Sequence, residues 1–234
     1  MLLVQFRMLN LIKKWFIPLK HGIDEARSDE LSVIWVHGAN QSGLSFQYLR
    51  SLTQFKNELV VEYDTSHKFK DNLEMLSDEI LKVRGPYFMI GHSLGGLYAL
   101  HLTKHVDVVG AVSISTPFAG SWTADWARFF VPTYQLFRDV GRRSIPIKES
   151  QNIKLTVDWT QIVSTKGNVP YHGGQNDGVC TIKSMKSRKD MELIEVPHTH
   201  FEVLCSDLVA KIILGRYEKV VRSIKTVNVL QKSF

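Results

Sequence analysis

Short apolar segments alternate along the chain with longer segments in which apolar residues recur every three to four positions. The short segments are rich in β-branched residues and have the length of buried strands. They cover residues 32–36, 59–63, 87–90, 108–114, 156–163 and 191–196. Continuous apolar strands separated by helices favour a parallel sheet that is covered on both faces. The pattern therefore predicts an α/β fold with a mostly parallel central sheet.

The longer segments have the period of amphipathic helices. They cover residues 43–55, 72–83, 94–105 and 203–214. In the second of them, Leu73, Leu76 and Ile80 fall on one face. Ligands of parallel α/β sheets bind beyond the carboxyl ends of the strands. The residues that directly follow each strand are therefore the first candidates for a functional site.

Length and composition fit one domain that spans residues 1–234, with 44% hydrophobic and 22% charged residues. The net charge of +6 comes without any run of five like charges. This pattern indicates a solvated basic surface, in preference to an acidic partner or an anionic membrane. Nucleic acid is not expected as a partner.

The two cysteines and the N-terminal segment bear on the compartment. Cys180 and Cys205 are too few for a disulfide scaffold, and we expect two buried free thiols. No signal peptide or membrane span is evident, which predicts a cytoplasmic protein. Residues 8–17 could form a basic amphipathic helix on a membrane, although packing on the domain is the favoured interpretation.

The strand at 87–90 is followed by Gly91-His92-Ser93-Leu94-Gly95, a G-x-S-x-G pattern that leads into a helix. In this context the pattern indicates a tight strand-to-helix turn that presents the serine hydroxyl above the sheet. The helix N-terminus behind it favours developing negative charge. Ser93 is therefore the predicted nucleophile. His92 points elsewhere at such a turn and is expected to orient or pack, not to act as the base.

The strand at 32–36 ends in His37-Gly38, where a backbone donor for an oxyanion can be placed. The predicted donors are the N–H groups of Leu94 and Ala39, with Asn40 as the alternative to Ala39.

The acid and the base should follow the serine in that order. Asp177 lies in a turn beyond the strand at 156–163 and is the predicted acid, whereas Asp158 falls inside the strand. His200 follows the last strand and directly precedes Phe201, so it is the predicted base, with His198 as the alternative. The H-x-H pair supplies too few ligands for a metal, and no metal or cofactor is expected.

Together these residues resemble the α/β-hydrolase superfamily, in particular its lipase-like serine esterases. A T-P-x-x-G-S stretch at 116–121 is similar to one in bacterial lipases and GPI-inositol-deacylase-like hydrolases. The resemblance implies an α/β-hydrolase fold and a triad of Ser93, Asp177 and His200. It also implies cleavage of a small-molecule or lipid-like carboxylic ester through an acyl-enzyme. The same triad serves thioesterases and acyltransferases, and a non-catalytic binding protein would be expected to have a broken triad.

The sheet pattern stops between residues 121 and 151, where aromatic residues recur near helical spacing. The resemblance favours a small apolar cap over the site, which would suit an acyl chain. The alternative is that the aromatic rings only fill the core. The candidate cap residues are Trp122, Trp126, Phe129 and Phe130.

Overall fold

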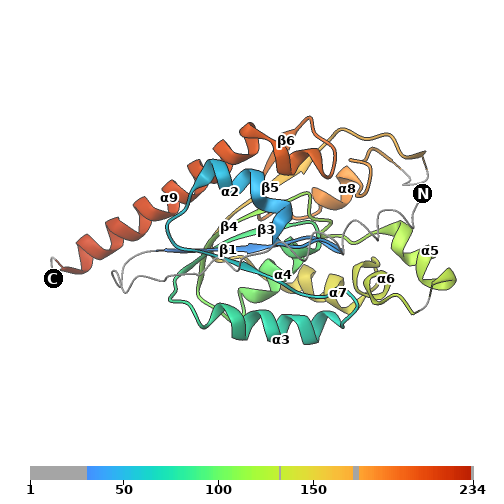
Figure 1. Cartoon of the computed structure of the whole chain (residues 1–234), viewed down its shortest axis with the longest axis horizontal. Helices are drawn as coiled ribbons and strands as arrows, with labels where there is room; N and C mark the ends of the chain where they lie inside the picture. The colour runs from blue at the N-terminus through green and yellow to red at the C-terminus, as the bar shows by residue number, and fades with distance from the viewer. Residues whose placement is uncertain (1–30, 132, 171–173, 233–234) are drawn as a thin grey trace, which may run out of the picture.

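A computed structural model describes residues 31–131, 133–170 and 174–232. Its centre is a parallel sheet of six strands in the order β2-β1-β3-β4-β5-β6 (Figure 1). The strands are β1 (Ser32–Val36), β2 (Glu58–Val61), β3 (Tyr87–His92), β4 (Val108–Ile114), β5 (Asp158–Ser164) and β6 (Glu192–Val196). Every predicted strand is present, with ends within two residues of the prediction.

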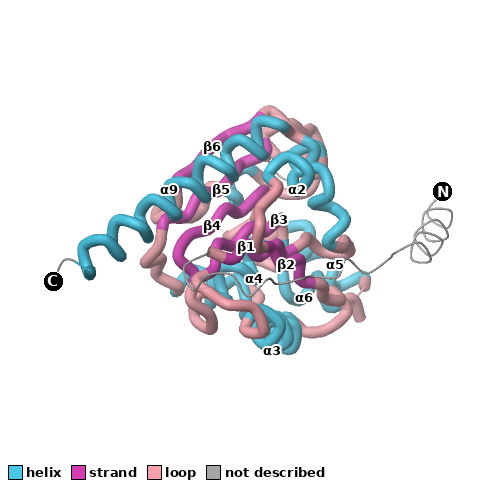
Figure 2. Tube along the Cα trace, turned by 60° about the vertical axis from the view of Figure 1, so that its left-hand side comes forward, coloured by secondary structure: helices cyan, strands magenta, loops and turns pink. Residues whose placement is uncertain are grey.

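Helices cover both faces of the sheet because successive strand residues point to opposite sides. On β1, Ile34 and Val36 face a core with α3 (Phe69–Ile80), α4 (Leu94–Leu102) and α7 (Ile145–Asn152). Val33 and Trp35 face a second core with α2 (Gln47–Thr53) and α9 (Asp207–Lys232). Figures 1 and 2 show these two helical layers on either side of the strands. The predicted α/β architecture is therefore confirmed.

The predicted helices at 72–83 and 94–105 correspond to α3 and α4 with ends displaced by up to three residues, and the other two differ more. The segment at 43–55 divides into a 3₁₀ turn, η2 (Gly43–Phe46), and α2. The last helix is far longer than the predicted 203–214, because α9 continues to Lys232 after a 3₁₀ turn, η4 (Glu202–Cys205). Gly215 lies inside α9, where it is exposed and has open space around it. Tyr217 and Val220 continue the apolar side of α9 onto the sheet.

The insertion between β4 and β5 has two distinct parts. Its last helix, α7, packs into the core through Ile147. Its first helices, α5 (Trp122–Phe130) and α6 (Gln135–Val140), lie together at one end of the molecule (Figure 1). The short helix α8 (Ile182–Met185) follows β5. Only α5 and α6 therefore remain as a candidate cap.

The structure corrects one expectation about the cysteines. Both thiols are free, but Cys205 is exposed and only Cys180 is buried. Cys205 is the last residue of the 3₁₀ turn η4, and Ser206 separates it from the start of α9. Residues 8–17 lie outside the described part of the chain. Within the described ranges, no helix is long and apolar enough to cross a membrane.

Candidate active site

Ser93 lies at a sharp turn between β3 and α4. Its backbone has φ 52° and ψ −118°, and α4 begins at the next residue. A positive φ is uncommon for a residue other than glycine and marks a constrained position. The Ser93 N–H donates to the Ile114 carbonyl at 2.8 Å, which ties the turn to the end of β4. The side chain is half-buried. The predicted strand–turn–helix context of the serine is therefore present.

The glycines at 91 and 95 are required by close backbone contacts. A Cβ on Gly95 would lie 2.0 Å from the Val36 carbonyl oxygen, at the end of β1. A Cβ on Gly91 would lie 2.6 Å from the Gly95 carbonyl oxygen. Both distances are impossible for a real side chain because backbone atoms on the other side cannot yield. The spacing of the G-x-S-x-G pattern follows from this packing of α4 against β1 and β3.

The predicted oxyanion donors lie on the loop after β1 and at the start of α4. Leu94 is the first residue of α4, so its N–H has no partner within the helix by position. On the other loop, the Gly38 N–H is occupied, since it donates to Gln41 Oε1 at 3.0 Å. Ala39 follows and is half-buried. Its role as the second donor stays a prediction.

Asn40, the alternative donor, connects this loop to the insertion. It has a φ of 54°, a conformation that asparagine tolerates better than most residues. Its side chain accepts a hydrogen bond from Thr65 Oγ1 at 2.8 Å and donates one to the Tyr134 hydroxyl. The Asn40 side chain therefore holds the loop after β1 against the segment between α5 and α6.

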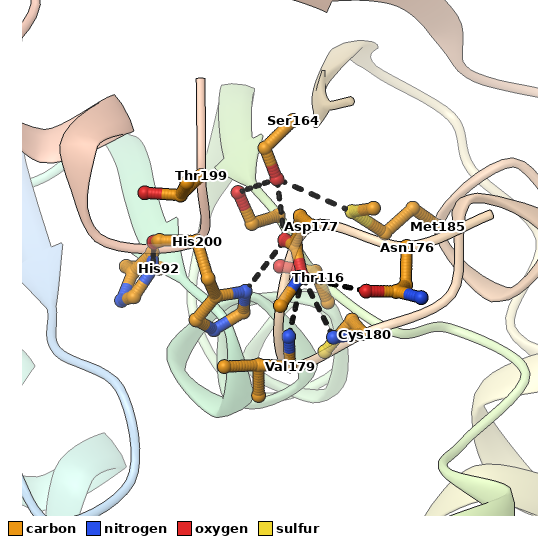
Figure 3. A network of polar contacts seen from close by, with 12 residues as sticks. His92, Thr116, Ser164, Asn176, Asp177, Val179, Cys180, Met185, Thr199 and His200 are labelled. Atoms are coloured by element: carbon orange, nitrogen blue, oxygen red, sulfur yellow. Dashed lines mark hydrogen bonds and ion pairs between the residues drawn. The ribbon is translucent and has the colours of Figure 1, made fainter. Parts of the chain in front are cut away.

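Asp177 and His200 are brought together as predicted. His200 Nδ1 lies 2.7 Å from Asp177 Oδ2, and both side chains are buried (Figure 3). The other carboxylate oxygen accepts from the Val179 and Cys180 N–H groups at 3.0 and 2.7 Å. An ionised carboxylate accepts from an Nδ1–H, which leaves Nε2 without a proton. His200 is thus oriented as a base would be.

The electrostatics of Asp177 favour its ionised form. Burial acts to raise the pKa of this carboxyl, but hydrogen bonds and charge from His200, together with the donors Ser164 and Cys180, outweigh it. The net result is a pKa below the usual value. Asp177 is therefore charged at neutral pH and can stabilise a protonated His200.

The competing acid and base occupy other positions. Asp158 opens β5, at the end of the strand opposite the serine turn, and its side chain pairs with Lys219 at 2.7 Å. His198 Nε2 contacts Ser206 Oγ at 2.7 Å instead of the carboxylate. Neither is placed to replace Asp177 or His200.

Sequence reasoning missed two residues that support the predicted acid, Asp177. Ser164, the last residue of β5, donates to Asp177 Oδ2 at 2.5 Å (Figure 3). Ser115 Oγ lies 2.7 Å from Ser164 Oγ, and its φ of 53° places it in a tight turn after β4. Both serines are fully buried. Their position directly after or at the end of a strand was the available signal.

Ser93 and His200 form no hydrogen bond with each other in the described part of the chain. Contacts of this kind often tighten only when substrate is bound. The link observed between them is indirect: His92, next to Ser93, has its Nε2 3.0 Å from the His200 carbonyl oxygen. The serine turn and the histidine loop are therefore neighbours.

Three residues of this cluster could in principle bind a metal ion. The ligand atoms of Asp177, Cys180 and His200 lie within 4.8 Å of one another. However, the carboxylate and the imidazole are hydrogen-bonded to each other. Burial and the Asp177 charge also raise the pKa of the Cys180 thiol well above its usual value. A protonated thiol is a poor ligand, so the set fits an acid–base pair better than a metal site.

The predicted cap aromatics lie on the surface of α5. Trp122, Trp126, Phe129 and Phe130 are 40%, 56%, 70% and 80% exposed. Their spacing of four, three and one residues places them along one stripe of the helix. The alternative that these rings only fill the core is therefore wrong.

Comparison with known proteins agrees with the α/β fold. A model of a family described as the alpha/beta hydrolase family matches residues 33–160. No match was found among curated protein sequences. Among solved structures, the mature lipase BlEst2 of Bacillus licheniformis superposes with a TM-score of 0.69 at 15% identity, covering 82% of this chain and 94% of that one.

Two further solved structures share the fold. Phospholipase PlaB from Legionella pneumophila, in complex with thio-NAD, has a TM-score of 0.62 at 13% identity, covering 85% of this chain and 62% of that one. A lipase-esterase related protein from Clostridium acetobutylicum has a TM-score of 0.52 at 14% identity, covering 81% of this chain and 93% of that one.

Proposed function

Because the chain belongs to the alpha/beta hydrolase family, we propose that it is a serine hydrolase that cleaves carboxylic esters through an acyl-enzyme on Ser93. The observation that carries the proposal is the 2.7 Å contact between Asp177 Oδ2 and His200 Nδ1, on loops beside the constrained turn at Ser93. Family membership supports a hydrolase. The proposal adds that the bond cleaved is a carboxylic ester and that Ser93, Asp177 and His200 act as nucleophile, acid and base.

In the first half of the reaction, His200 Nε2 accepts the hydroxyl proton as Ser93 Oγ attacks the ester carbonyl carbon. Asp177 stabilises the imidazolium that forms. The tetrahedral intermediate then collapses, the bond to the alcohol oxygen breaks, and His200 returns the proton to the departing alcohol. In the second half, His200 takes a proton from the water that attacks the acyl carbon. The bond between that carbon and Ser93 Oγ then breaks, His200 returns the proton to Ser93 Oγ, and the carboxylic acid leaves.

The negative oxygen of each intermediate needs donors that are already in place. The N–H groups of Leu94 and Ala39 are the proposed pair. Leu94 contributes from the start of α4, where the helix dipole also favours negative charge. Removing one such donor in a serine hydrolase costs on the order of 10²- to 10³-fold in kcat.

The exposed stripe on α5 is the proposed contact for the apolar part of the ester. Monomeric proteins rarely expose several large aromatic side chains together without a binding role. The hydrogen bond from Asn40 to Tyr134 connects the insertion to the loop of the proposed donor Ala39. A small-molecule or lipid-like ester with an apolar acyl chain fits this arrangement.

The test is turnover of p-nitrophenyl esters from acetate to laurate by the wild type, Ser93→Ala and Asp177→Asn. We expect measurable wild-type hydrolysis that falls by about 10⁴-fold or more in both variants. Thioester and acyl-acceptor substrates, assayed beside the esters, report thioesterase or acyltransferase activity. An inactive wild type would favour a non-catalytic binding role and refute the proposal.

A further inference from the structure

His92 lies between the two loops that the proposed reaction has to keep in register. The ring is fully buried. Its Nε2 lies 3.0 Å from the His200 carbonyl oxygen, and its Nδ1 lies 3.0 Å from Gln41 Oε1. The same Gln41 oxygen accepts the Gly38 N–H at 3.0 Å. A continuous polar chain thus runs from Gly38, before Ala39, to the backbone of His200.

The polar groups between Gly38 and His200 are closely packed. A Cβ on Gly38 would lie 2.7 Å from Gln41 Oε1 and 2.8 Å from His92 Nδ1. The absence of a side chain at 38 therefore lets both polar groups approach the loop. On the other side, the rings of His92 and His200 lie 4.8 Å apart between centroids. Displacement of His92 would be transmitted to both loops.

The chemistry of the ring limits how it can satisfy its neighbours. Burial and the nearby His200 lower the pKa of His92 to about 3, so the imidazole is neutral at working pH and has one N–H. Both atoms that face it are acceptors. Gln41 cannot relieve this by turning its amide, because an NH₂ group would then face the Gly38 N–H. The single ring proton can therefore donate to only one of the two acceptors at a time, the Gln41 amide oxygen or the His200 carbonyl oxygen.

We propose that His92, together with Gln41, is a positioning residue that holds the loop of the oxyanion donor Ala39 in register with the loop of the base His200. The inference rests on the proposed serine-hydrolase function. Neither residue touches the reacting atoms in this account. They act through the Gly38 amide on one side and the His200 carbonyl on the other, which sets the distance between donor and base.

Substitutions at His92 and at Gln41 remove different parts of this polar chain. His92→Phe keeps a ring between the loops and removes both polar contacts, while Gln41→Met keeps the length of a half-buried side chain and removes the amide. We expect kcat to fall by about tenfold to a hundredfold in each, with KM changed less than about threefold, because a misplaced donor acts on the transition state. His92→Asn, whose side-chain amide supplies N–H donors, should recover part of the loss.

Coupling between the two residues distinguishes a shared role from separate ones. If they act as one unit, the double variant should lose little more kcat than the worse single variant. A trifluoromethyl ketone, which forms an oxyanion on the serine, should bind more weakly in the same proportion as kcat/KM falls. The matched control is His198→Phe, in the same loop as His200 but bonded to Ser206, which should keep kcat.

The outcomes separate this inference from the function on which it rests. No turnover by the wild type refutes the proposed function itself. An active wild type with unchanged kcat in Gln41→Met refutes the positioning role, whether or not His92→Phe folds. Multiplicative losses in the double variant, or a loss in His198→Phe equal to that in His92→Phe, would also overturn it.

Discussion

Ser164 offers the sharpest test of how the proposed acid, Asp177, is held in place. Its hydroxyl donates to Asp177 Oδ2 at 2.5 Å, the same oxygen that His200 Nδ1 contacts. A hydrogen bond to a charged group is worth about 1.5–3 kcal/mol. Ser164→Ala removes it from a fully buried site and leaves the Ser115 hydroxyl without its 2.7 Å partner. We expect the free energy of unfolding to fall by about 2 kcal/mol.

The effect on catalysis follows from the same contact. If the whole 1.5–3 kcal/mol were expressed in the transition state, kcat would fall by about 10- to 150-fold. The contact between Asp177 and His200 and the two backbone donors remain, so we expect a loss of about tenfold, near the lower end. The assay is ester turnover beside Ser150→Ala, a buried serine whose hydroxyl donates only to the Ile147 carbonyl. The control should keep kcat.

The pH dependence of stability gives an independent readout. The pKa of Asp177 is lowered in the folded protein, so its stabilising contribution is present above the unfolded value of about 3.9 and is lost as pH falls through the folded pKa. Ser164→Ala raises that folded pKa. The difference in Tm between wild type and variant should be about 3–10 °C at pH 7 and narrower below about pH 4. If the Tm difference between wild type and Ser164→Ala is the same at pH 7 and below about pH 4, or if the variant keeps full kcat, the proposed role of Ser164 is refuted.

Other substitutions have equally definite outcomes. Gly95→Ala should abolish activity and lower Tm, because its Cβ would lie 2.0 Å from a β1 carbonyl oxygen; a soluble, active variant would contradict this contact. His200→Ala should lose about 10⁴-fold or more in kcat while His198→Ala keeps most of it, and the reverse result would reassign the base. Trp126→Ser with Phe129→Ser should raise KM for laurate esters several-fold and leave acetate unchanged, since about 0.8 kcal/mol accompanies each buried methylene. Equal effects on both esters would exclude α5 as the acyl contact.

Much of the fold was predictable because burial on both faces produces a distinct sequence pattern. The strands at 32–36 and 108–114 were placed by their continuous apolar runs. The extent of α9 was not, because Gly215 resembles a helix end and only the sheet surface shows that Tyr217 and Val220 continue the packing.

Some residues of the candidate site were likewise predictable from the sequence, and others were not. Asp177 and His200 were found from chain order and their position after strands, and the structure places them 2.7 Å apart. Ser164 and Gln41 have no sequence motif, since their partners are brought together only by the pairing of strands and the turn of loops. The exposure of Cys205 likewise depends on the path of the chain between η4 and α9.

Covalent trapping of the nucleophile is the decisive measurement for the proposed role of Ser93. The protein is incubated with a fluorophosphonate, digested, and the modified residue is located by mass spectrometry. We expect one adduct per chain, on Ser93, with labelling lost in Ser93→Ala and strongly slowed in His200→Ala. An unlabelled wild-type protein, or an adduct on any other residue, would contradict it.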